Sequence, residues 1–127
     1  MTPLAVFRKS YRAYVDKDLA AIESILADDF HFTSPIDNRL DRKTYLRICW
    51  PNSQGLERFD EVFACEAGDR ACIAYEATAK GGKRFRNCEI ATVRDGKLVA
   101  VEVYFGWNVP HKLADGSHAD NDGAEHP

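Results

Sequence analysis

Glu76, Asn87 and Glu89 are the polar side chains whose types and spacing are best suited to chemistry. Each lies in an otherwise apolar, alternating stretch that is typical of a half-buried strand. Two carboxyl groups that lie close together in apolar surroundings raise the pKa of at least one of them, and general acid–base catalysis uses acids of this kind. We predict such a site where the three side chains meet. The alternatives are a hydrogen-bonded structural cluster and a sheet face that solvent reaches.

The register of the first hairpin decides whether Glu76 joins this cluster. Residues 70–79 and 84–93 alternate with period two and are predicted to be strands. Gly81 and Gly82 separate them, and both can adopt positive φ, so we predict a two-residue loop. That loop sets Glu76 opposite Asn87, on the same face of the sheet as Glu89.

A second hairpin joins this strand to another predicted over residues 97–107. A two-residue Asp95-Gly96 loop would set Glu89 opposite Glu102, and like charges that face each other are destabilising. We therefore predict a three-residue loop, in which Glu89 faces Val101 instead. A slip of one residue would reverse every side chain. The chosen register predicts one mostly apolar face, made of Asn87, Glu89, Ala91, Val93, Val99, Val101, Val103 and Phe105.

Helices that must support this sheet are predicted in the N-terminal half. Thr2, Asp18 and Asp41 are candidate N-caps, for helices over about residues 3–16, from 19 up to the acidic pair at 28–29, and from 42 to 48. A short strand is predicted over 30–33 and a first meander strand over 57–66. Helices followed by an antiparallel meander favour an α+β architecture, with a helix layer on one side of the sheet.

Composition excludes several partners. The chain has 127 residues and a net charge of −3, so no basic field favours nucleic acid or an anionic membrane. No apolar run approaches the roughly 20 residues that span a bilayer, and the N-terminus lacks a signal-like pattern, so we predict a cytoplasmic protein. The four cysteines form no ligand or disulfide pattern and are predicted to be reduced structural thiols. No metal site is predicted.

The last residues differ in composition from the rest. From Ala114 onward the chain is polar and aperiodic and holds four acidic residues and no Lys or Arg. We predict one domain over 1–113 and a disordered acidic tail over 114–127.

The second face of the predicted sheet is also apolar. It holds Ile73, Tyr75, Ala77, Cys88, Ile90, Ala100 and Tyr104. Helices can cover one face only, and an apolar patch of this kind marks an interface. We predict a homodimer in which a second subunit covers it.

Two segments carry a resemblance to a known family. "YRAYVDKDLAAIESILADDFHFTSP" and "CEIATVRDGKLVAVEVYFG" resemble, in order and spacing, the nuclear-transport-factor-2-like superfamily and its SnoaL-like, ketosteroid-isomerase-like branch, over about residues 4–110. The resemblance implies a cone-shaped α+β barrel with N-terminal helices packed on a strongly bent antiparallel or mixed sheet. It also implies a deep pocket and a dimer. Members include isomerases, cyclases, dehydratases, epoxide hydrolases and non-catalytic binding domains, so the fold does not give the function.

The isomerase residues can be transferred one position at a time. Ser34 stands where the isomerases have their general-base aspartate, and Ser10 where they have a helix tyrosine. Their protonated acid corresponds to Glu89 or to its neighbour Cys88. The substitutes within the same pocket are Tyr14 as a hydrogen-bond donor and Asp37 as a displaced base, although Asp37 also suits a turn. The predicted pocket-lining residues, which suit an ordinary core as well, are Ser34, Asn87, Phe30, Phe32, Tyr45, Trp50, Val101, Val103, Phe105 and Trp107.

The sequence therefore predicts a pocket for a small hydrophobic molecule. With Glu89 as acid or base, assisted by Glu76, Asn87 or Tyr14, the protein would act on a carbonyl-bearing substrate without a dissociable cofactor. A non-catalytic domain that binds a hydrophobic ligand, or a dimerisation module, is the alternative.

Overall fold

Side-chain caps set where the three helices begin. In the computed structural model, which describes residues 1–120 and 125–126, Thr2 Oγ1 accepts from the backbone N–H of Ala5 at 3.1 Å and starts α1 (Pro3–Asp16). Asp18 and Asp41 cap α2 (Leu19–Ile25) and α3 (Arg42–Ile48) in the same way. Lys17, at φ 56°, ends α1 in the left-handed conformation. The three predicted caps are confirmed.

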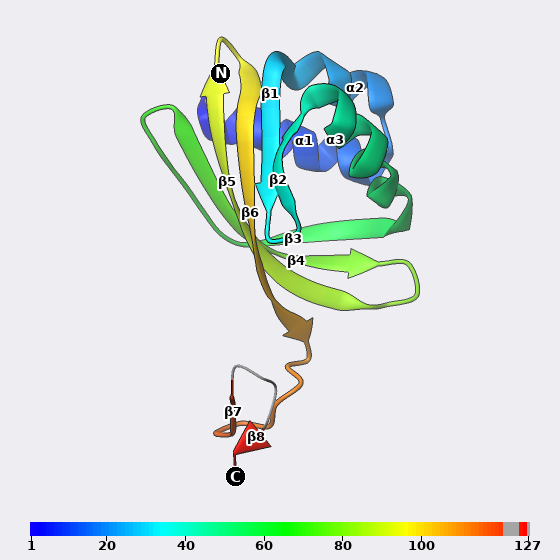
Figure 1. The fold of residues 1–127 in the computed structure, drawn as a ribbon, viewed down its shortest axis with the longest axis vertical. Helices are drawn as coiled ribbons and strands as arrows, with labels where there is room; N and C mark the ends of the chain where they lie inside the picture. The colour runs from blue at the N-terminus through cyan, green and yellow to red at the C-terminus, as the bar shows by residue number, and fades with distance from the viewer. Residues whose placement is uncertain (121–124, 127) are drawn as a thin grey trace.

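Six strands form one curved, open, mixed sheet in the order β2-β1-β6-β5-β4-β3 (Figure 1). The strands are β1 (Leu26–Ser34), β2 (Asp37–Asp41), β3 (Leu56–Ala67), β4 (Arg70–Ala79), β5 (Arg84–Arg94) and β6 (Lys97–Val109). A 3₁₀ helix, η1 (Trp50–Gly55), leads from α3 into β3. Strands β1 and β6 are parallel and the other neighbours are antiparallel. The predicted α+β architecture is confirmed, while β2 lies where the sequence predicted a turn.

The helices pack on one face of this sheet, which we call the inner face (Figure 1). Burial on β4 alternates, so that Ala71, Ile73, Tyr75 and Ala77 are buried and their neighbours are partly exposed. Together with Val6, Phe7 and Ile22 of the helices, these side chains form the core. The opposite surface of the sheet is called the outer face.

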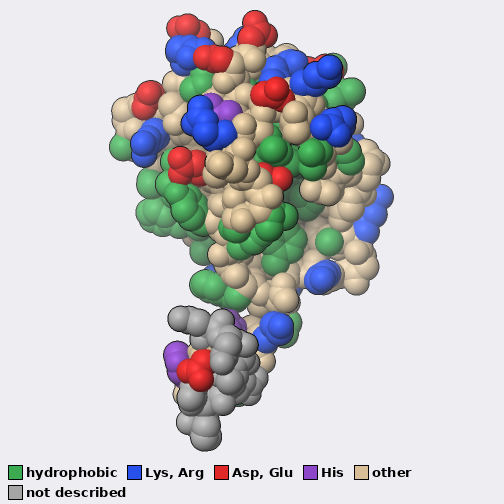
Figure 2. Space-filling model, viewed as in Figure 1, with side chains coloured by type: hydrophobic (Ala, Val, Ile, Leu, Met, Phe, Trp, Pro, Cys, Tyr) green, Lys and Arg blue, Asp and Glu red, His purple; other side chains and the backbone are tan. Residues whose placement is uncertain are grey.

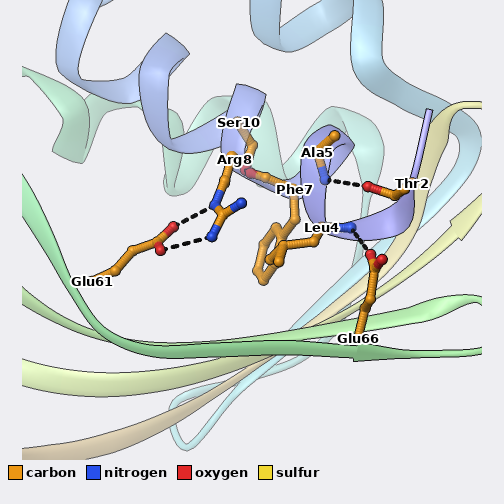
Figure 3. A network of polar contacts seen from close by, with 8 residues as sticks. All are labelled: Thr2, Leu4, Ala5, Phe7, Arg8, Ser10, Glu61 and Glu66. Carbon is orange, nitrogen blue, oxygen red and sulfur yellow. Dashed lines mark hydrogen bonds and ion pairs between the residues drawn. The ribbon is translucent and has the colours of Figure 1, made fainter.

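Polar contacts hold the first half of α1 against β3 (Figure 3). Arg8 donates through Nε and Nη2 to the two carboxylate oxygens of Glu61 on β3, at 2.7 and 3.0 Å. The N–H of Leu4, in the first turn of α1, donates to Glu66 Oε2 of the same strand at 2.9 Å. Both acceptors lie on β3, so these contacts tie the first half of α1 to that strand.

The predicted register of the first hairpin is wrong by one residue. The loop has three residues, Lys80 to Gly82, since the N–H of Ala79 donates to Lys83 O and Thr78 pairs with Arg84. Both glycines adopt positive φ, which a longer loop can use as readily as a two-residue turn. Glu76 therefore pairs with Arg86 on the outer face, and Tyr75, which was predicted there, lies on the inner face opposite Asn87.

The second hairpin corrects a different prediction. Its loop is the two-residue Asp95-Gly96, with φ values of 54° and 75° that define a tight hairpin turn. A β-bulge at Val99 then shifts the pairing, so that Glu89 faces Val103 and Ile90 faces Glu102. The bulge removes the clash of carboxylates on which the three-residue prediction was based. It also keeps Glu89, Val101, Val103 and Phe105 on the inner face, as predicted.

The end of the chain is described in part. Strand β7 (His118–Ala119) pairs with β8 (Glu125–His126), and residues 121–124 and 127 lie outside the described residues. The domain limits 1–113 and the disordered tail 114–127 stay predictions. Within the described residues, no helix has both the length and the apolar composition needed to cross a membrane.

Candidate functional site

A cavity of about 200 Å³ lies between the helices and the inner face of the sheet. On the face shown in Figure 2, a hollow bordered by apolar side chains lies below the helices. Most of its lining is apolar, and the polar groups are two carboxyl groups, several hydroxyl groups, one thiol and one amide. The lining residues are Phe7, Ser10, Tyr11, Tyr14, Leu26, Phe30, Phe32, Ser34, Asp37, Tyr45, Cys49, Asn52, Leu56, Phe59, Tyr75, Phe85, Glu89, Leu98, Val101, Val103 and Phe105.

Glu89 brings a carboxyl group into this apolar space. Its register on β5 points it to the inner face, where Tyr75 of β4 donates to Oε2 at 2.5 Å. Burial raises the pKa of Glu89 to about 7, and the hydroxyl groups of Tyr75 and Tyr11 partly offset that rise. A carboxyl group with this pKa exchanges its proton at neutral pH, which an exposed glutamate does not do.

Three further tyrosine hydroxyl groups of the cavity come from the helices. Tyr14 of α1 and Tyr45 of α3 share a hydrogen bond between their hydroxyl groups. The hydroxyl of Tyr11 is buried and lies close enough to the Glu89 carboxyl group to lower its pKa, but it makes no well-formed hydrogen bond among the described residues. Burial raises the pKa of all three phenols, so they remain protonated and act as hydrogen-bond donors.

Aromatic packing fixes these hydroxyl groups in place. Tyr11, Phe59 and Tyr75 contact one another edge to face, with ring centroids 4.8 to 5.4 Å apart. On the far side of Tyr14, the ring of Trp50 packs edge-on at 4.8 Å. Because each ring is held by its neighbours, the hydroxyl groups keep their positions without a network of charges.

A second carboxyl group lies where β1 turns into β2. Ser34 Oγ donates to Asp37 Oδ2 at 2.7 Å and accepts from the N–H of Ile36 at 3.1 Å. Both Ser34 and Asp37 line the cavity. Asp37 and burial together raise the pKa of the nearby Cys49 thiol to about 11, so this thiol stays protonated and is a poor nucleophile.

The structure places most of the residues predicted for the site on the cavity wall. Glu89, Tyr14 and Asp37 are there, and so are the predicted lining residues Ser34, Phe30, Phe32, Tyr45, Val101, Val103 and Phe105.

Four predicted site residues lie elsewhere. Glu76 points to the outer face because of the corrected register, where its carboxylate lies 3.7 Å from Arg86 Nε. Asn87 is next to the cavity and contacts Tyr75. Trp50 packs behind Tyr14, and Trp107, which is 53% exposed, stacks on His111.

Tyr11 and Tyr75 are the cavity tyrosines that the sequence prediction missed. Tyr11 lies between Phe7 and Tyr14 on the apolar face of the first helix, where the sequence pattern indicates burial. The sequence prediction assigned no role to its hydroxyl group. Tyr75 was placed on the wrong face by the one-residue register error. Among the described residues, no group of three or more His, Cys, Asp or Glu side chains is arranged to hold a metal ion.

A family model described as the SnoaL-like domain matches residues 7–101, which is most of the chain. The chain belongs to the SnoaL-like family. The match runs from within α1 to the first half of β6 and includes Glu89 on β5. No curated protein matches this SnoaL-like chain in sequence.

Solved structures of three enzyme-related proteins share the fold of this SnoaL-like domain. IdmH from Streptomyces antibioticus, a proposed polyketide cyclase, is 20% identical, with a TM-score of 0.69 over 81% of this chain and 91% of IdmH. A proposed ketosteroid isomerase from Kribbella flavida DSM 17836 is 20% identical, with a TM-score of 0.69 over 82% of this chain and 77% of its own.

An LEH-like epoxide hydrolase of M. tuberculosis is 15% identical, with a TM-score of 0.70 over 82% of each chain. At these identities the likeness establishes the nuclear-transport-factor-2-like fold alone, and the three reactions differ. The function of this chain must therefore be argued from its own cavity.

Proposed function

We propose that this SnoaL-like domain is an acid–base enzyme that moves protons on a small, neutral, apolar substrate with a carbonyl group. The observation that carries this proposal is Glu89, whose carboxyl group lines an otherwise apolar cavity and has its pKa raised by burial to about 7. At neutral pH such a group is present both with and without its proton. It can therefore serve as an acid and as a base.

Glu89 and Tyr11 are the proposed donors to the substrate carbonyl oxygen. When a proton leaves the carbon next to a carbonyl, negative charge develops on that oxygen, and donors already in place stabilise it. The Tyr11 hydroxyl is buried beside the Glu89 carboxyl group and makes no well-formed hydrogen bond among the described residues, so the two groups are placed to donate to one ligand oxygen. Tyr14 and Tyr45 extend the same polar end of the cavity.

Asp37 is the proposed base. Its carboxylate lines the cavity and is held by Ser34, so the serine at the usual base position orients a carboxylate three residues further along the chain. Asp37 takes a proton from the carbon beside the carbonyl and returns it to a different carbon. The sum of the two transfers is an isomerisation that leaves the protonation of the protein unchanged.

The cavity suggests the class of substrate. Its volume of about 200 Å³ lies below the roughly 300–1,000 Å³ of sites for drug-sized ligands, which suits a molecule of one or two rings. None of the described lining residues is Lys, Arg or His. Because nothing there would compensate a buried negative charge, we propose a neutral substrate.

Proton exchange on a model ketone tests this proposal without knowledge of the natural substrate. We expect the protein to accelerate exchange of the α-protons of 2-tetralone, a neutral two-ring ketone, in D₂O, followed by ¹H NMR. Glu89→Gln is expected to lower that acceleration by about 10²- to 10⁴-fold, and Asp37→Asn to remove it. Glu102→Gln, on the outer face, is the control. Exchange by Glu89→Gln at the wild-type rate would exclude Glu89 as the acid.

A non-catalytic domain that binds an apolar ligand is the second candidate. It is favoured by Ser34 and Ser10, which stand where the isomerases have their base and their tyrosine; Ser10 Oγ donates to the backbone oxygen of Phe7 at 2.6 Å. Thermal-shift measurements with 2-tetralone separate the two candidates. Equal stabilisation of the wild type and Glu89→Gln, with no proton exchange by either, would favour binding alone.

The outer face supports a homodimer. Phe63 and Tyr104 are 63% and 52% exposed there, and the partly buried Ile90 and Ala74 lie on the same surface. Light scattering is expected to give a dimer for the wild type and a monomer for Phe63→Glu, and a monomeric wild type would contradict it. A cytoplasmic location and the lack of nucleic-acid and membrane partners stay predictions from the sequence.

A further inference from the structure

A chain of three hydrogen bonds runs from the backbone of β6 to the carboxyl group of Glu89. The N–H of Gly106 donates to Asn87 Oδ1 at 3.2 Å. Asn87 Nδ2 donates to the hydroxyl of Tyr75 at 3.4 Å. Tyr75 in turn donates to Glu89 Oε2 at 2.5 Å. Asn87 is thus the link between the main chain and the candidate acid, although it does not line the cavity.

A β-bulge creates the first of these bonds. Pairing shifts between Phe85 and Asn87, so that two residues of β6, Gly106 and Trp107, lie opposite Arg86 alone. A side chain at position 106 would not fit, because its Cβ would lie 2.3 Å from Arg86 O. The bulge interrupts the ladder at Gly106, and the Asn87 side chain accepts from its N–H instead of a strand carbonyl.

The direction of every bond in this chain follows from its first donor. A backbone N–H can only donate, so the oxygen of the Asn87 amide must face Gly106 and its NH₂ group must face Tyr75. The Tyr75 oxygen then accepts a hydrogen bond, and its single proton is directed to Glu89 Oε2. The carbonyl oxygen of a carboxylic acid is a better acceptor than its hydroxyl oxygen, so a Tyr75 donor on Oε2 favours the Glu89 proton on Oε1.

We propose that Asn87 is a positioning residue, which holds the Tyr75 hydroxyl on Oε2 and so confines the exchangeable proton of Glu89 to Oε1. This inference depends on the proposed function in one respect only, namely that Glu89 donates that proton to a ligand. The geometry explains how a group that titrates can present one oxygen as the donor to a ligand while the other stays bound to the protein. Asn87 would act through Tyr75, without touching the substrate.

The groups around Glu89 decide whether its pKa can report on this hydrogen-bond chain. The titratable groups around it are phenols, namely Tyr11 and Tyr14 of α1, Tyr45 of α3 and Tyr75 of β4. The four residues that β6 contributes to the cavity, Leu98, Val101, Val103 and Phe105, are apolar. Asp37 and Cys49 are the other titratable groups on the wall. Of these groups, only Tyr75 receives a hydrogen bond from Asn87.

The test is an NMR titration of the Glu89 carboxyl carbon in the ligand-free protein, with ¹³C-labelled glutamate. Without Asn87, Tyr75 becomes a weaker donor, so Asn87→Ala is expected to raise the pKa of Glu89 by about half a unit. In a Tyr75→Phe background the same change should have no further effect, because the link is already broken. Asn108→Ala, an exposed asparagine on β6, is the matched control.

A structural role alone would lower stability equally in both backgrounds and leave this pKa unmoved. That result would overturn the proposal, as would an equal rise with and without the Tyr75 hydroxyl. If Asn87→Ala does not fold, Asn87→Asp still accepts from Gly106 N–H but cannot donate to Tyr75. Its added charge raises the pKa of Glu89 in both backgrounds, and the rise is expected to be larger with the Tyr75 hydroxyl than in Tyr75→Phe. The titration uses no substrate, so it tests the hydrogen-bond chain alone. The proposed enzyme activity is tested separately, by proton exchange on 2-tetralone.

Discussion

A tyrosine–glutamate hydrogen bond lies on each face of the sheet, and the two differ in their surroundings. On the inner face Tyr75, which is 4% exposed, donates to Glu89 at 2.5 Å. On the outer face Tyr104, which is 52% exposed, donates to Glu102 at 2.7 Å. The pKa of Glu89 is raised to about 7 by burial, although its tyrosine bond acts in the opposite direction.

The comparison shows that burial, and not the hydrogen bond from a tyrosine, raises the pKa of Glu89. Both carboxylates accept from a phenol, and only the inner one is also removed from water. Desolvation disfavours the charged form by more than one hydrogen bond restores it. The raised pKa of Glu89 is therefore a property of the face on which this glutamate lies, and the following experiments test that statement.

The largest expected difference is in how stability depends on pH. The folded protein keeps the Glu89 proton up to a pH of about 7, whereas the unfolded chain loses it near 4.5. Between these values the folded state binds more protons, so the free energy of unfolding falls as the pH rises and levels off above this window. Glu89→Gln should remove that fall and, at about pH 8, raise the free energy of unfolding by up to about 3 kcal/mol.

Urea denaturation at several pH values measures this effect. Glu102→Gln provides the comparison, and both variants are made in the Phe63→Glu background, which keeps the outer face exposed. Replacement of the exposed Glu102 carboxylate should then change the free energy of unfolding by less than about 0.5 kcal/mol at any pH. The same pH profile for both variants would show that the two faces do not differ as described.

Removal of the two tyrosine hydroxyl groups should give a smaller contrast. Tyr75→Phe takes a buried donor from Glu89 and should cost about 1 kcal/mol in the free energy of unfolding. It should also raise the pKa of Glu89, since the bond from Tyr75 lowers it. Tyr104→Phe should cost less than Tyr75→Phe, because water can replace the hydrogen bond of an exposed hydroxyl. Chemical denaturation and carboxyl NMR check both, and a larger loss from Tyr104→Phe would reverse the assignment of the faces.

The smallest effect is expected for Glu76, which was predicted beside Glu89 but lies on the outer face. Its carboxylate is 3.7 Å from Arg86 Nε, whose side chain is 43% exposed. Glu76→Gln should therefore change the free energy of unfolding by no more than about 1 kcal/mol, and by less as salt is added. It should leave exchange of 2-tetralone within about twofold of the wild type. A strong loss of exchange would return Glu76 to the candidate site.

Local signals in the sequence were sufficient for the elements. Thr2, Asp18 and Asp41 cap helices where predicted, because a capping side chain bonds to backbone groups within its own turn. The limits of β4 and the start of β5 and β6 match the prediction closely, because they are set by glycine turns and a period of two.

Local signals in the sequence predicted the candidate site only in part. Two glycines at positions 81 and 82 suit a loop of two or three residues, and that choice exchanged Glu76 for Tyr75 on the inner face. The bulge at Val99 has no local signature, and together with the two-residue loop it moved the partner of Glu89 by two residues, from the predicted Val101 to Val103. Glu89 stayed on the predicted face because a shift of two preserves the alternation of side chains.

The sequence by itself determined which residues form helices and strands, the family, and a glutamate on an inward-facing strand position. Only the tertiary structure decided which phenols meet that glutamate, that Ser34 holds Asp37, and that a backbone N–H at Gly106 is bonded through Asn87 toward the acid. The reason is physical. Caps and alternation depend on neighbours within a few residues, whereas strand register and the burial of a charge depend on contacts between segments far apart in the chain.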